Sequence, residues 1–381
     1  MIWLQLTILL AVLGLLVVAT TNLFCLKRLG DYPKPQVWPR VSVLVPARNE
    51  EHNIGPCLES LLSQDYPDYQ VICLDDCSED RTWQVMQKFA KRHRFVPVQG
   101  KEPPEGWLGK HWACHQLAQM ADGEIILFTD ADTVHKPETL RAAVAAMLSE
   151  RADLLTAIPK ERAMSWGEKM VVPVISWGVF SFVPVCLAHK LSWPSLSLTI
   201  GQFMMFKKEV YEKIGGHAAV RSHATDDMAL GRLIKAKKFT WRILDASNFV
   251  TCRMYSDFKA VFQGFSRHIF AAFDYRVLPF VLALLVLALI LFEPFALLIL
   301  AVFGVIKDPG LILASGACTI GMGLSWLISN TRLGLPAYIP LLYPAITTLL
   351  LIIAVRSSLS LSLGKLSWKG RNLLRHRVKF W

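Results

Sequence analysis

Hydrophobic residues are unevenly distributed along the chain. Residues 2–25 form an apolar run without a charge, residues 277–355 are almost wholly apolar, and residues 41–260 alternate apolar and polar stretches. A run of about 20 apolar residues is long enough to cross a bilayer as a helix. The pattern predicts one globular domain between membrane segments. The expected division is an anchor at 1–26, a linker at 27–40, a globular domain at 41–270, transmembrane or re-entrant helices at 271–356 and a basic tail at 357–381.

The globular domain is expected to be an α/β domain. Its short apolar runs predict strands at 41–46, 70–74, 95–98, 124–128 and 153–158, and its mixed stretches predict helices at 54–63, 82–92, 110–121 and 137–150. Strands that alternate with helices are typical of a parallel sheet of the doubly wound, Rossmann-like type.

One apolar segment inside this domain has two interpretations. Residues 171–188 are nearly all apolar, and aromatic residues accompany them at Trp177, Phe180, Phe182 and Trp193. The segment fits a buried core helix, and it fits equally an interfacial segment where a lipid substrate enters. Periodicity does not separate the two interpretations.

The C-terminal region contains further apolar stretches at 277–306, 311–329 and 335–355. Glu293-Pro294 lies near the middle of the first stretch. A charge beside a helix breaker predicts a hairpin of two short segments there rather than one span.

Basic residues predict how the chain is oriented in a membrane. No charge precedes the first apolar run and Lys27-Arg28 follow it, which fits an uncleaved anchor better than a cleaved signal. The tail carries Lys365, Lys369, Arg371, Arg375, Arg377 and Lys379, with no acid among them. Because basic flanks stay in the cytoplasm, we expect a multi-pass protein of the cell membrane with its catalytic domain and tail cytoplasmic.

This orientation requires an even number of crossings after the domain. Four are favoured, and two plus a re-entrant piece are the alternative.

Charge and cysteine content narrow the class of protein further. The formal net charge of +11 fits attraction to anionic headgroups. No nucleic-acid-binding motif accompanies the charge, so nucleic acid is not an expected partner. The 8 cysteines are scattered singly, which favours a reduced cytoplasmic domain over disulfides. His111, Cys114 and His115 lack a second pair at zinc spacing, so ordinary packing is expected of them.

Acidic residues follow two of the predicted strands. Asp75-Asp76 end the strand at 70–74, and Asp130-Ala131-Asp132 end the strand at 124–128. Open α/β sheets bind ligands at the carboxyl edge of their strands, and Mg²⁺ prefers one or two carboxylates together with phosphate oxygens. A third pair, Asp226-Asp227, lies in the first turn of a predicted helix, where acids also offset the helix dipole. The sequence therefore predicts that these distant acids gather at one diphosphate-binding site.

Four motifs resemble those of the family 2 glycosyltransferases, which have a GT-A nucleotide-sugar-binding fold. They are Val43–Glu51, Leu74–Asp80, Asp130-Ala131-Asp132 and Asp226-Asp227, and the resemblance covers roughly residues 41–270. Three further motifs are similar to those of membrane-anchored members that glycosylate lipids, such as carotenoid, hopanoid and ceramide glucosyltransferases. These motifs are Gly106–Lys110, Gly201–Met204 and Gly215-Gly216-His217.

The resemblance implies roles for individual residues. Asp76, with Asp75, would bind the uracil of a UDP-sugar, and Asp132, with Asp130, would hold Mg²⁺ or Mn²⁺ on the diphosphate. Asp227, in one motif with Asp226, would be the general base of a transfer that inverts the anomeric carbon. Lys110 would add positive charge beside the diphosphate. The remaining residues expected to line the nucleotide-sugar site are Pro46, Arg48, Glu50, Gln202 and Arg267, and His217 is a further candidate.

One departure from the family pattern bears on the product. Polymer-forming relatives carry Gln-x-x-Arg-Trp in the acceptor channel, and here the matching stretch is Gln263-Gly264-Phe265-Ser266-Arg267-His268. Arg267 lies one position later than the arginine of that pattern, and the tryptophan is absent. Two roles stay open for Arg267, namely contact with the diphosphate and contact with lipid headgroups.

The favoured function is transfer of a single sugar, glucose from UDP-glucose, to the hydroxyl of a membrane lipid. The alternatives are a polyprenyl-phosphate or polysaccharide acceptor, and a non-catalytic membrane subunit. Arg253 and Tyr255 also match the closer relatives, without an assigned chemistry.

Overall fold

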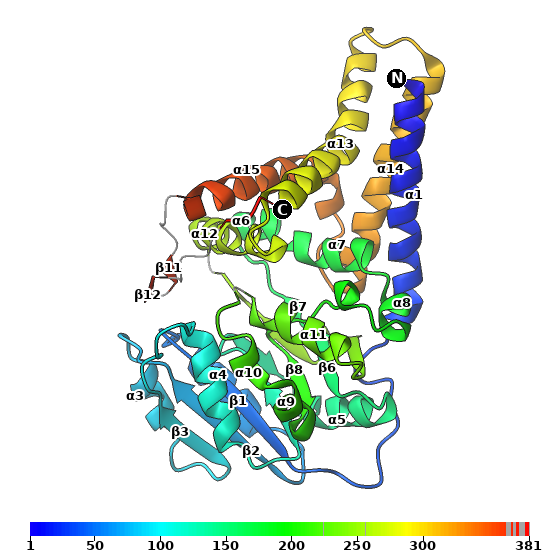
Figure 1. Cartoon of the computed structure of the whole chain (residues 1–381). Coiled ribbons are helices and arrows are strands. Elements are labelled where there is room, and N and C mark those ends of the chain that lie inside the picture. Colours follow the sequence, from blue (N-terminus) through cyan, green and yellow to red (C-terminus); the bar gives the residue numbers. More distant parts are fainter. Residues whose placement is uncertain (224, 256, 363–366, 369–370, 373–377, 381) are drawn as a thin grey trace.

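The computed structural model describes residues 1–223, 225–255, 257–362, 367–368, 371–372 and 378–380. A sheet domain lies at one end of the molecule and a group of long helices at the other (Figure 1). Four basic residues of the predicted tail lie outside the described residues, namely Lys365, Lys369, Arg375 and Arg377.

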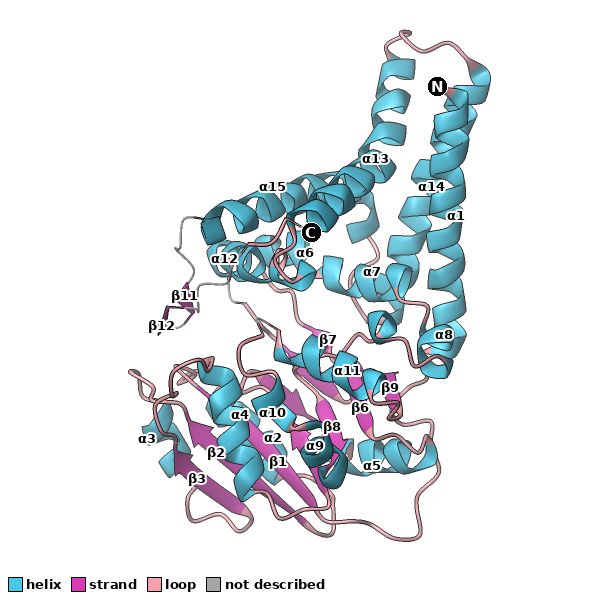
Figure 2. Ribbon diagram, viewed as in Figure 1, coloured by secondary structure: helices cyan, strands magenta, loops and turns pink. Residues whose placement is uncertain are grey.

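A seven-stranded sheet forms the centre of the domain (Figure 2). Its order is β3 (Phe95–Gln99), β2 (Tyr69–Asp75), β1 (Val41–Ala47), β4 (Ile125–Phe128), β8 (Met204–Lys207), β6 (Leu154–Ile158) and β9 (Trp241–Asp245). β8 runs antiparallel to both of its neighbours, and the other pairs are parallel. The prediction of a parallel sheet is therefore wrong at β8. The chain enters this strand from the carboxyl edge, after passing close to the long helices, and so runs back across the sheet.

Helices cover both faces of the sheet, because alternate residues of the central strands point to opposite layers. In β1, Val43 and Val45 pack with the layer that contains α2 (Ile54–Leu62) and α5 (Thr139–Ser149). Leu44 packs with the other layer, which contains α4 (Gly109–Met120), α9 (Lys208–Ile214) and α11 (Asp226–Ala236). The helix expected at 82–92 is shorter than predicted, since α3 spans Thr82–Gln87. A small sheet of β5 (Thr133–His135), β10 (Val250–Cys252) and β7 (Lys160–Glu161) follows the carboxyl ends of β4 and β6.

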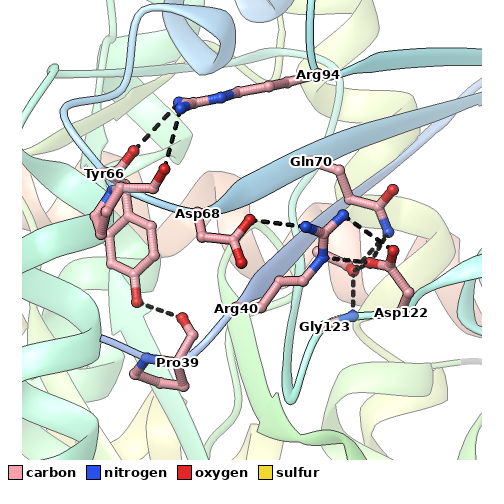
Figure 3. Close-up of polar contacts among 10 residues, drawn as sticks. Pro39, Arg40, Tyr66, Asp68, Gln70, Arg94, Asp122 and Gly123 are labelled. Carbon is pink, nitrogen blue, oxygen red and sulfur yellow. Dashed lines mark hydrogen bonds and ion pairs between the residues drawn. The ribbon is translucent and has the colours of Figure 1, made fainter. Parts of the chain in front are cut away.

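A polar network fixes the amino ends of the strands, opposite the edge that carries the acids (Figure 3). The Arg40 guanidinium donates to Asp122 Oδ1 from Nε at 2.9 Å and to Asp68 Oδ1 from Nη1 at 2.7 Å. Tyr66 Oη donates to the carbonyl oxygen of Pro39 at 2.6 Å. These bonds join the segments that precede β1, β2 and β4, so they hold the strand order without contributing to the acidic edge.

Four described helices are long and apolar enough to cross a membrane. They are α1 (Ile2–Cys25), α13 (Val277–Val302), α14 (Pro309–Arg332) and the stretch Ile339–Leu359, which includes most of α15 (Tyr343–Ser362). Figure 1 shows α1 and α14 side by side, whereas α15 lies across α13. The favoured number of four crossings after the domain is thus wrong for the described chain, in which three such helices follow it.

The hairpin expected around Glu293-Pro294 is also wrong, because α13 is one continuous helix with Pro294 inside it. The Gln5 side chain of α1 donates to the Glu293 carboxylate, so the charged group has a partner between the helices. A proline inside a helix removes one backbone hydrogen bond and bends the helix without ending it.

The apolar segment at 171–188 combines features of both interpretations. It is divided among α6 (Trp166–Val171), α7 (Pro173–Phe182) and α8 (Val185–Lys190). Trp177 is buried and stacks on Trp326 of α14 with ring centroids 4.8 Å apart. Phe182 and Leu187 are each about half exposed, at 50% and 51%. The segment therefore packs one side against the long helices and leaves apolar side chains uncovered on another.

The sheet domain is joined to the long helices by an ion pair and a disulfide. Arg332 Nη1, at the end of α14, lies 2.9 Å from Asp245 Oδ2 at the end of β9, and Arg332 Nη2 donates to the Leu26 carbonyl at 3.0 Å. A disulfide links Cys25 of α1 to Cys186 of α8, with Cα atoms 5.4 Å apart. The prediction that the cysteines are all unpaired is wrong for these two. The fold brings them together across 161 residues of sequence, a pairing that spacing alone does not reveal.

Candidate active site

The loops after β1 and β2 interlock at the carboxyl edge of the sheet. Asn49 and Cys77 both have left-handed backbone conformations, with φ of 51° and 53°. The Asn49 backbone N–H donates to Ser78 Oγ at 2.9 Å, and the Glu79 N–H donates to Asn49 Oδ1 at 2.8 Å. Arg48 is buried and donates to the carbonyl of Asp76 at 2.7 Å. Arg48 therefore supports the loop that carries the predicted nucleotide-binding acids.

The two acids after β2 are both buried. Asp75 is 6% exposed and Asp76 is 2% exposed. Burial raises the pKa of Asp75, while hydrogen bonds from Ser78 oppose the increase. Pro46, near the carboxyl end of β1, pairs in register with Leu74 of β2. These residues form the wall of the edge nearest β1 and β2.

A lysine joins the acids that follow β4 to those that begin α11. Lys110, at the start of α4, lies with its Nζ 2.7 Å from Asp130 Oδ1. Burial opposes ionisation of Asp226, but Lys110, followed by His111 and His217, holds the pKa of Asp226 well below its ordinary value. The pKa of the Cys114 thiol is raised by burial and responds to Asp226, Asp130 and Asp76 together. Acids from three separate motifs therefore surround the start of α4, as the sequence predicted.

Asp227 is held as a hydrogen-bond acceptor at the start of α11. The Gly201 backbone N–H donates to Asp227 Oδ2 at 3.1 Å, and the Met228 N–H donates to Oδ1 at 2.7 Å. A side chain at Gly201 would place its Cβ 3.2 Å from Asp227 Oδ2, so a glycine allows this close approach. Burial, and then the negative charge of Asp226, raise the pKa of Asp227 to about 7. A carboxylate with this pKa is suited to accept a proton near neutral pH.

A second group of acids surrounds Asp132. Burial, followed by the charges of Asp130 and Glu50, raises the pKa of Asp132 to about 7. Glu161, on β7, is 7% exposed and accepts from Gln202 Nε2 at 3.2 Å. Burial, and then Asp132 and Asp130, raise the pKa of Glu161 to about 8.

These acids fit a divalent cation. Asp132 Oδ1 is buried and has no hydrogen-bond partner among the described residues. Two of these carboxylates, Asp132 and Glu161, have raised pKa values that reflect burial and neighbouring negative charge, and hard divalent cations bind such oxygens. The donor set therefore agrees with the predicted roles of Asp130 and Asp132 toward Mg²⁺ or Mn²⁺.

A group of softer ligands lies on the other side of Lys110. Cys114 Sγ, a ring nitrogen of His217 and a carboxylate oxygen of Asp226 lie within 4.8 Å of one another. His111 is buried beside them, and burial lowers its pKa to about 4, so its ring is neutral at physiological pH. Cys114, for which ordinary packing was expected, is a member of this group, whereas His111 and His115 are not.

Tyr255 lies between the charge of Arg267 and the acids of the site, since its pKa responds to both. Burial raises the pKa of Tyr255 to about 12, and Tyr255 responds to Arg267, Glu161 and Asp132. Its ring packs over Gly264, where an added Cβ would lie 2.3 Å from it. The glycine in the Gln263-Gly264-Phe265 stretch therefore makes room for an aromatic ring between α12 (Phe258–His268) and the acids.

Glu161 and Tyr211 were not found from the sequence. Glu161 closely follows the strand Leu154–Ile158, so the rule that predicted Asp76 and Asp132 applies to it as well. The presence of only one acid there, after Pro159-Lys160, gave a weaker signal than the acid pairs. Tyr211 lies inside a helix, and nothing in the sequence distinguishes it from a core tyrosine.

Comparison with known proteins identifies the type of domain. Residues 42–215 match the model described as Glycosyl transferase family 2. The 4,4'-diaponeurosporenoate glycosyltransferase of Staphylococcus aureus (strain USA300) is 27% identical over 238 residues, and the match covers 60% of this chain and 60% of the relative. The chain thus aligns with less than two thirds of that relative's length.

A solved structure shares the fold over nearly the whole chain. It is the mannosyltransferase PcManGT from Pyrobaculum calidifontis in complex with GDP-Man and Mn²⁺. The TM-score is 0.51 at 18% sequence identity, and the likeness covers 94% of this chain and 98% of the other. Residues 42–215 are therefore similar to the family 2 glycosyltransferases, and the domain that contains them has the GT-A fold.

Proposed function

We propose that this protein transfers one sugar from a UDP-sugar, UDP-glucose in the first instance, to the hydroxyl group of a membrane lipid, with inversion at the anomeric carbon. The observation that carries the proposal is the convergence of Asp130, Lys110, Asp226 and Asp227 at the carboxyl edge of the sheet. The arrangement unites an acid site for a diphosphate-bound cation with a carboxylate of suitable pKa for proton removal.

The proposed reaction is a single displacement. The acceptor oxygen attacks the anomeric carbon, its proton passes to Asp227, and the bond from that carbon to the diphosphate oxygen breaks. The bonding electrons leave with the nucleoside diphosphate. Lys110 offsets part of the negative charge that develops on the leaving group. A divalent cation held by Asp130 and Asp132 would supply further charge neutralisation when bound.

The nucleotide and acceptor sides are assigned from their different surroundings. The buried acids after β2, which Arg48 and Ser78 support, form the proposed uracil side. The acceptor side is proposed to lie toward α6, α7 and α12, where exposed apolar side chains include Trp166 at 67% and Phe258 at 48%. An apolar acceptor agrees with the relative that is named for 4,4'-diaponeurosporenoate. The absence of the Gln-x-x-Arg-Trp pattern favours one transfer over polymer synthesis.

The test uses the full chain in lipid nanodiscs with Mn²⁺, labelled UDP-glucose and a total lipid extract, followed by mass spectrometry of the lipid products. The wild-type protein is expected to form a lipid that carries one hexose. Asp227→Asn and Asp132→Asn should each reduce the rate by at least about a thousandfold, because each removes a group that acts at the reacting centre. Glu209→Gln, on the exposed face of α9, is the matched control.

Two outcomes would contradict the proposal. Full activity in Asp227→Asn would exclude it as the base, and a ladder of polymer masses would exclude a single transfer. Labelled GDP-mannose is assayed in parallel, because the mannosyltransferase of the same fold is in complex with that donor. A product only from GDP-mannose would replace the proposed donor.

A further inference from the structure

The motif Gly215-Gly216-His217 has no role in the chemistry described above, yet it lies directly behind Asp226. His217 is fully buried, at 0% exposure, in α10 (Gly216–Ala219). One side of its ring contacts Tyr211 of α9 and Phe128 of β4, with ring centroids 5.8 and 4.9 Å away. Its Nε2 lies 3.4 Å from Asp226 Oδ2. The ring thus occupies the space between the hydrophobic core and the first acid of α11.

The hydrogen bonds of Tyr211 determine which ring nitrogen of His217 carries the proton. The His217 backbone N–H donates to Tyr211 Oη at 3.0 Å, and Tyr211 Oη lies 2.7 Å from His217 Nδ1. A hydroxyl oxygen can accept two hydrogen bonds, so Nδ1–H could also donate to it, but that tautomer would turn a bare Nε2 lone pair toward the Asp226 carboxylate. We therefore assign Tyr211 Oη as the donor to Nδ1. Nδ1 is then the acceptor, and the neutral ring carries its hydrogen on Nε2. That N–H faces the Asp226 carboxylate.

The two glycines make this arrangement possible. Gly215 ends α9 in the left-handed conformation, with φ of 88°, which is the usual role of glycine after a helix. Gly216 also has a positive φ, of 49°, and a Cβ there would lie 2.5 Å from atoms of the Tyr211 ring. A side chain at Gly216 would therefore displace the Tyr211 ring from the His217 backbone.

We propose that Tyr211 and His217 form a buried relay that positions Asp226, and that the negative charge of Asp226 in turn controls the ionisation of the base Asp227. Tyr211 and His217 are positioning residues, since neither touches the reacting atoms. The proposal rests on the proposed role of Asp227. The 3.4 Å contact is not a hydrogen bond in this structure, where Nε2 and Oδ2 each lack a hydrogen-bond partner among the described residues. Catalytic hydrogen bonds often tighten only when substrate binds.

The relay is tested first by Tyr211→Phe, with Tyr66→Phe as the matched control. Each variant removes one buried hydroxyl, and Tyr66 donates to Pro39 at the opposite edge of the sheet (Figure 3). Tyr211→Phe is expected to lower kcat about tenfold to a hundredfold with the donor KM unchanged, since small displacements of a catalytic group have effects of this size. Tyr66→Phe is expected to change kcat less than twofold. Equal effects of the two variants would overturn the relay.

Two variants of His217 separate positioning from packing. His217→Gln places an amide N–H where Nε2–H lies, and His217→Ala does not. Relative to the wild type, the decrease in log kcat of the glutamine variant is expected to be at most half of the decrease in the alanine variant. Equal kcat in both variants would contradict the relay.

The pH dependence provides a readout that altered packing alone would not move. Asp227 is faced by Lys110 from α4, Asp130 from the loop after β4 and Asp226 from α11, while His111 and His217 face Asp226. Loss of the His217 donor weakens the stabilisation of ionised Asp226 and so raises the lower apparent pKa of the coupled Asp226–Asp227 pair. In Tyr211→Phe, a second ionisation should therefore enter the acid limb of kcat, whereas an acid limb identical to that of the wild type would argue against the relay.

The final measurements do not depend on enzyme activity. In the full chain labelled with ¹⁵N-histidine, the ring signals that His217→Gln removes should show a protonated Nε2 and a bare Nδ1. A protonated Nδ1 would overturn the relay, as would one tightly bound zinc per chain, because Cys114, His217 and Asp226 would then be metal ligands. If wild-type protein transfers no sugar but shows the expected tautomer, the proposed function fails and the relay stands.

Discussion

The ion pair between Arg332 and Asp245 is expected to hold the sheet domain against the long helices. The two charged atoms are 2.9 Å apart, and the side chains are 11% and 1% exposed. Arg332→Met leaves Asp245 buried without its cation, and loss of one partner of a buried pair costs about 3–5 kcal/mol. At roughly 2 °C per kcal/mol for a large domain, the melting temperature should fall by about 6–10 °C.

The measurement is the thermal melting temperature of the full chain in nanodiscs. Lys213→Met removes an exposed i,i+4 pair with Glu209 and is the matched control, with an expected cost below about 0.5 kcal/mol. The double variant Arg332→Met with Asp245→Asn should recover part of the loss, because no unpaired charge remains buried. If Arg332→Met melts within 1 °C of Lys213→Met, the pair does not stabilise the junction between the two parts.

Three further predictions concern the site and the disulfide. The kcat for transfer should rise with pH and level off above about pH 7, since Asp227 must lose its proton to act as a base and its pKa is raised to about 7; a flat profile between pH 5 and 8 would disprove this. Removal of divalent cations with EDTA should abolish transfer, and Mn²⁺ should raise the melting temperature of the wild type but not of Asp132→Asn; equal shifts in both would place the cation elsewhere. Reduction of the Cys25–Cys186 bond should destabilise the fold by about 2–4 kcal/mol, as seen in the melting temperature, and Cys186→Ser should melt at the same temperature with or without reductant.

The positions of five of the seven strands of the central sheet, and of the acid motifs, were predictable from the sequence, whereas β8 and β9 were not predicted. Buried strands appear as apolar runs, and acids that follow parallel strands must meet at one edge, as Asp76 and Asp130 do. The pairing of β8 was not predictable in the same way, because Met204–Lys207 is short and its direction depends on where the preceding segment leads. The partner that stabilises Glu293 comes from Gln5, on a helix almost 300 residues away, and local sequence contains no sign of it.

The long-range polar contacts were also beyond the sequence. Tyr211, His217 and Asp226 meet because three helices of one layer pack on β4, and a hydrogen-bonded tyrosine has the same sequence signature as a buried one. The Gly215-Gly216-His217 motif was recognised as a likeness to lipid-modifying relatives, but its physical reason required the backbone angles and the position of the Tyr211 ring.

The antiparallel direction of β8 has a consequence for how such enzymes diversify. The chain leaves the sheet after Ile158 of β6 and returns at Met204 of β8, and Thr156 and Met204 are partners in register. The two ends of the intervening segment of 45 residues therefore lie close together, on neighbouring strands of the sheet. Exchange of this segment between homologues would alter the part that packs against the long helices while β1, β2 and their loops stay intact. The segment is therefore a natural unit for chimeric proteins that test the proposed acceptor side.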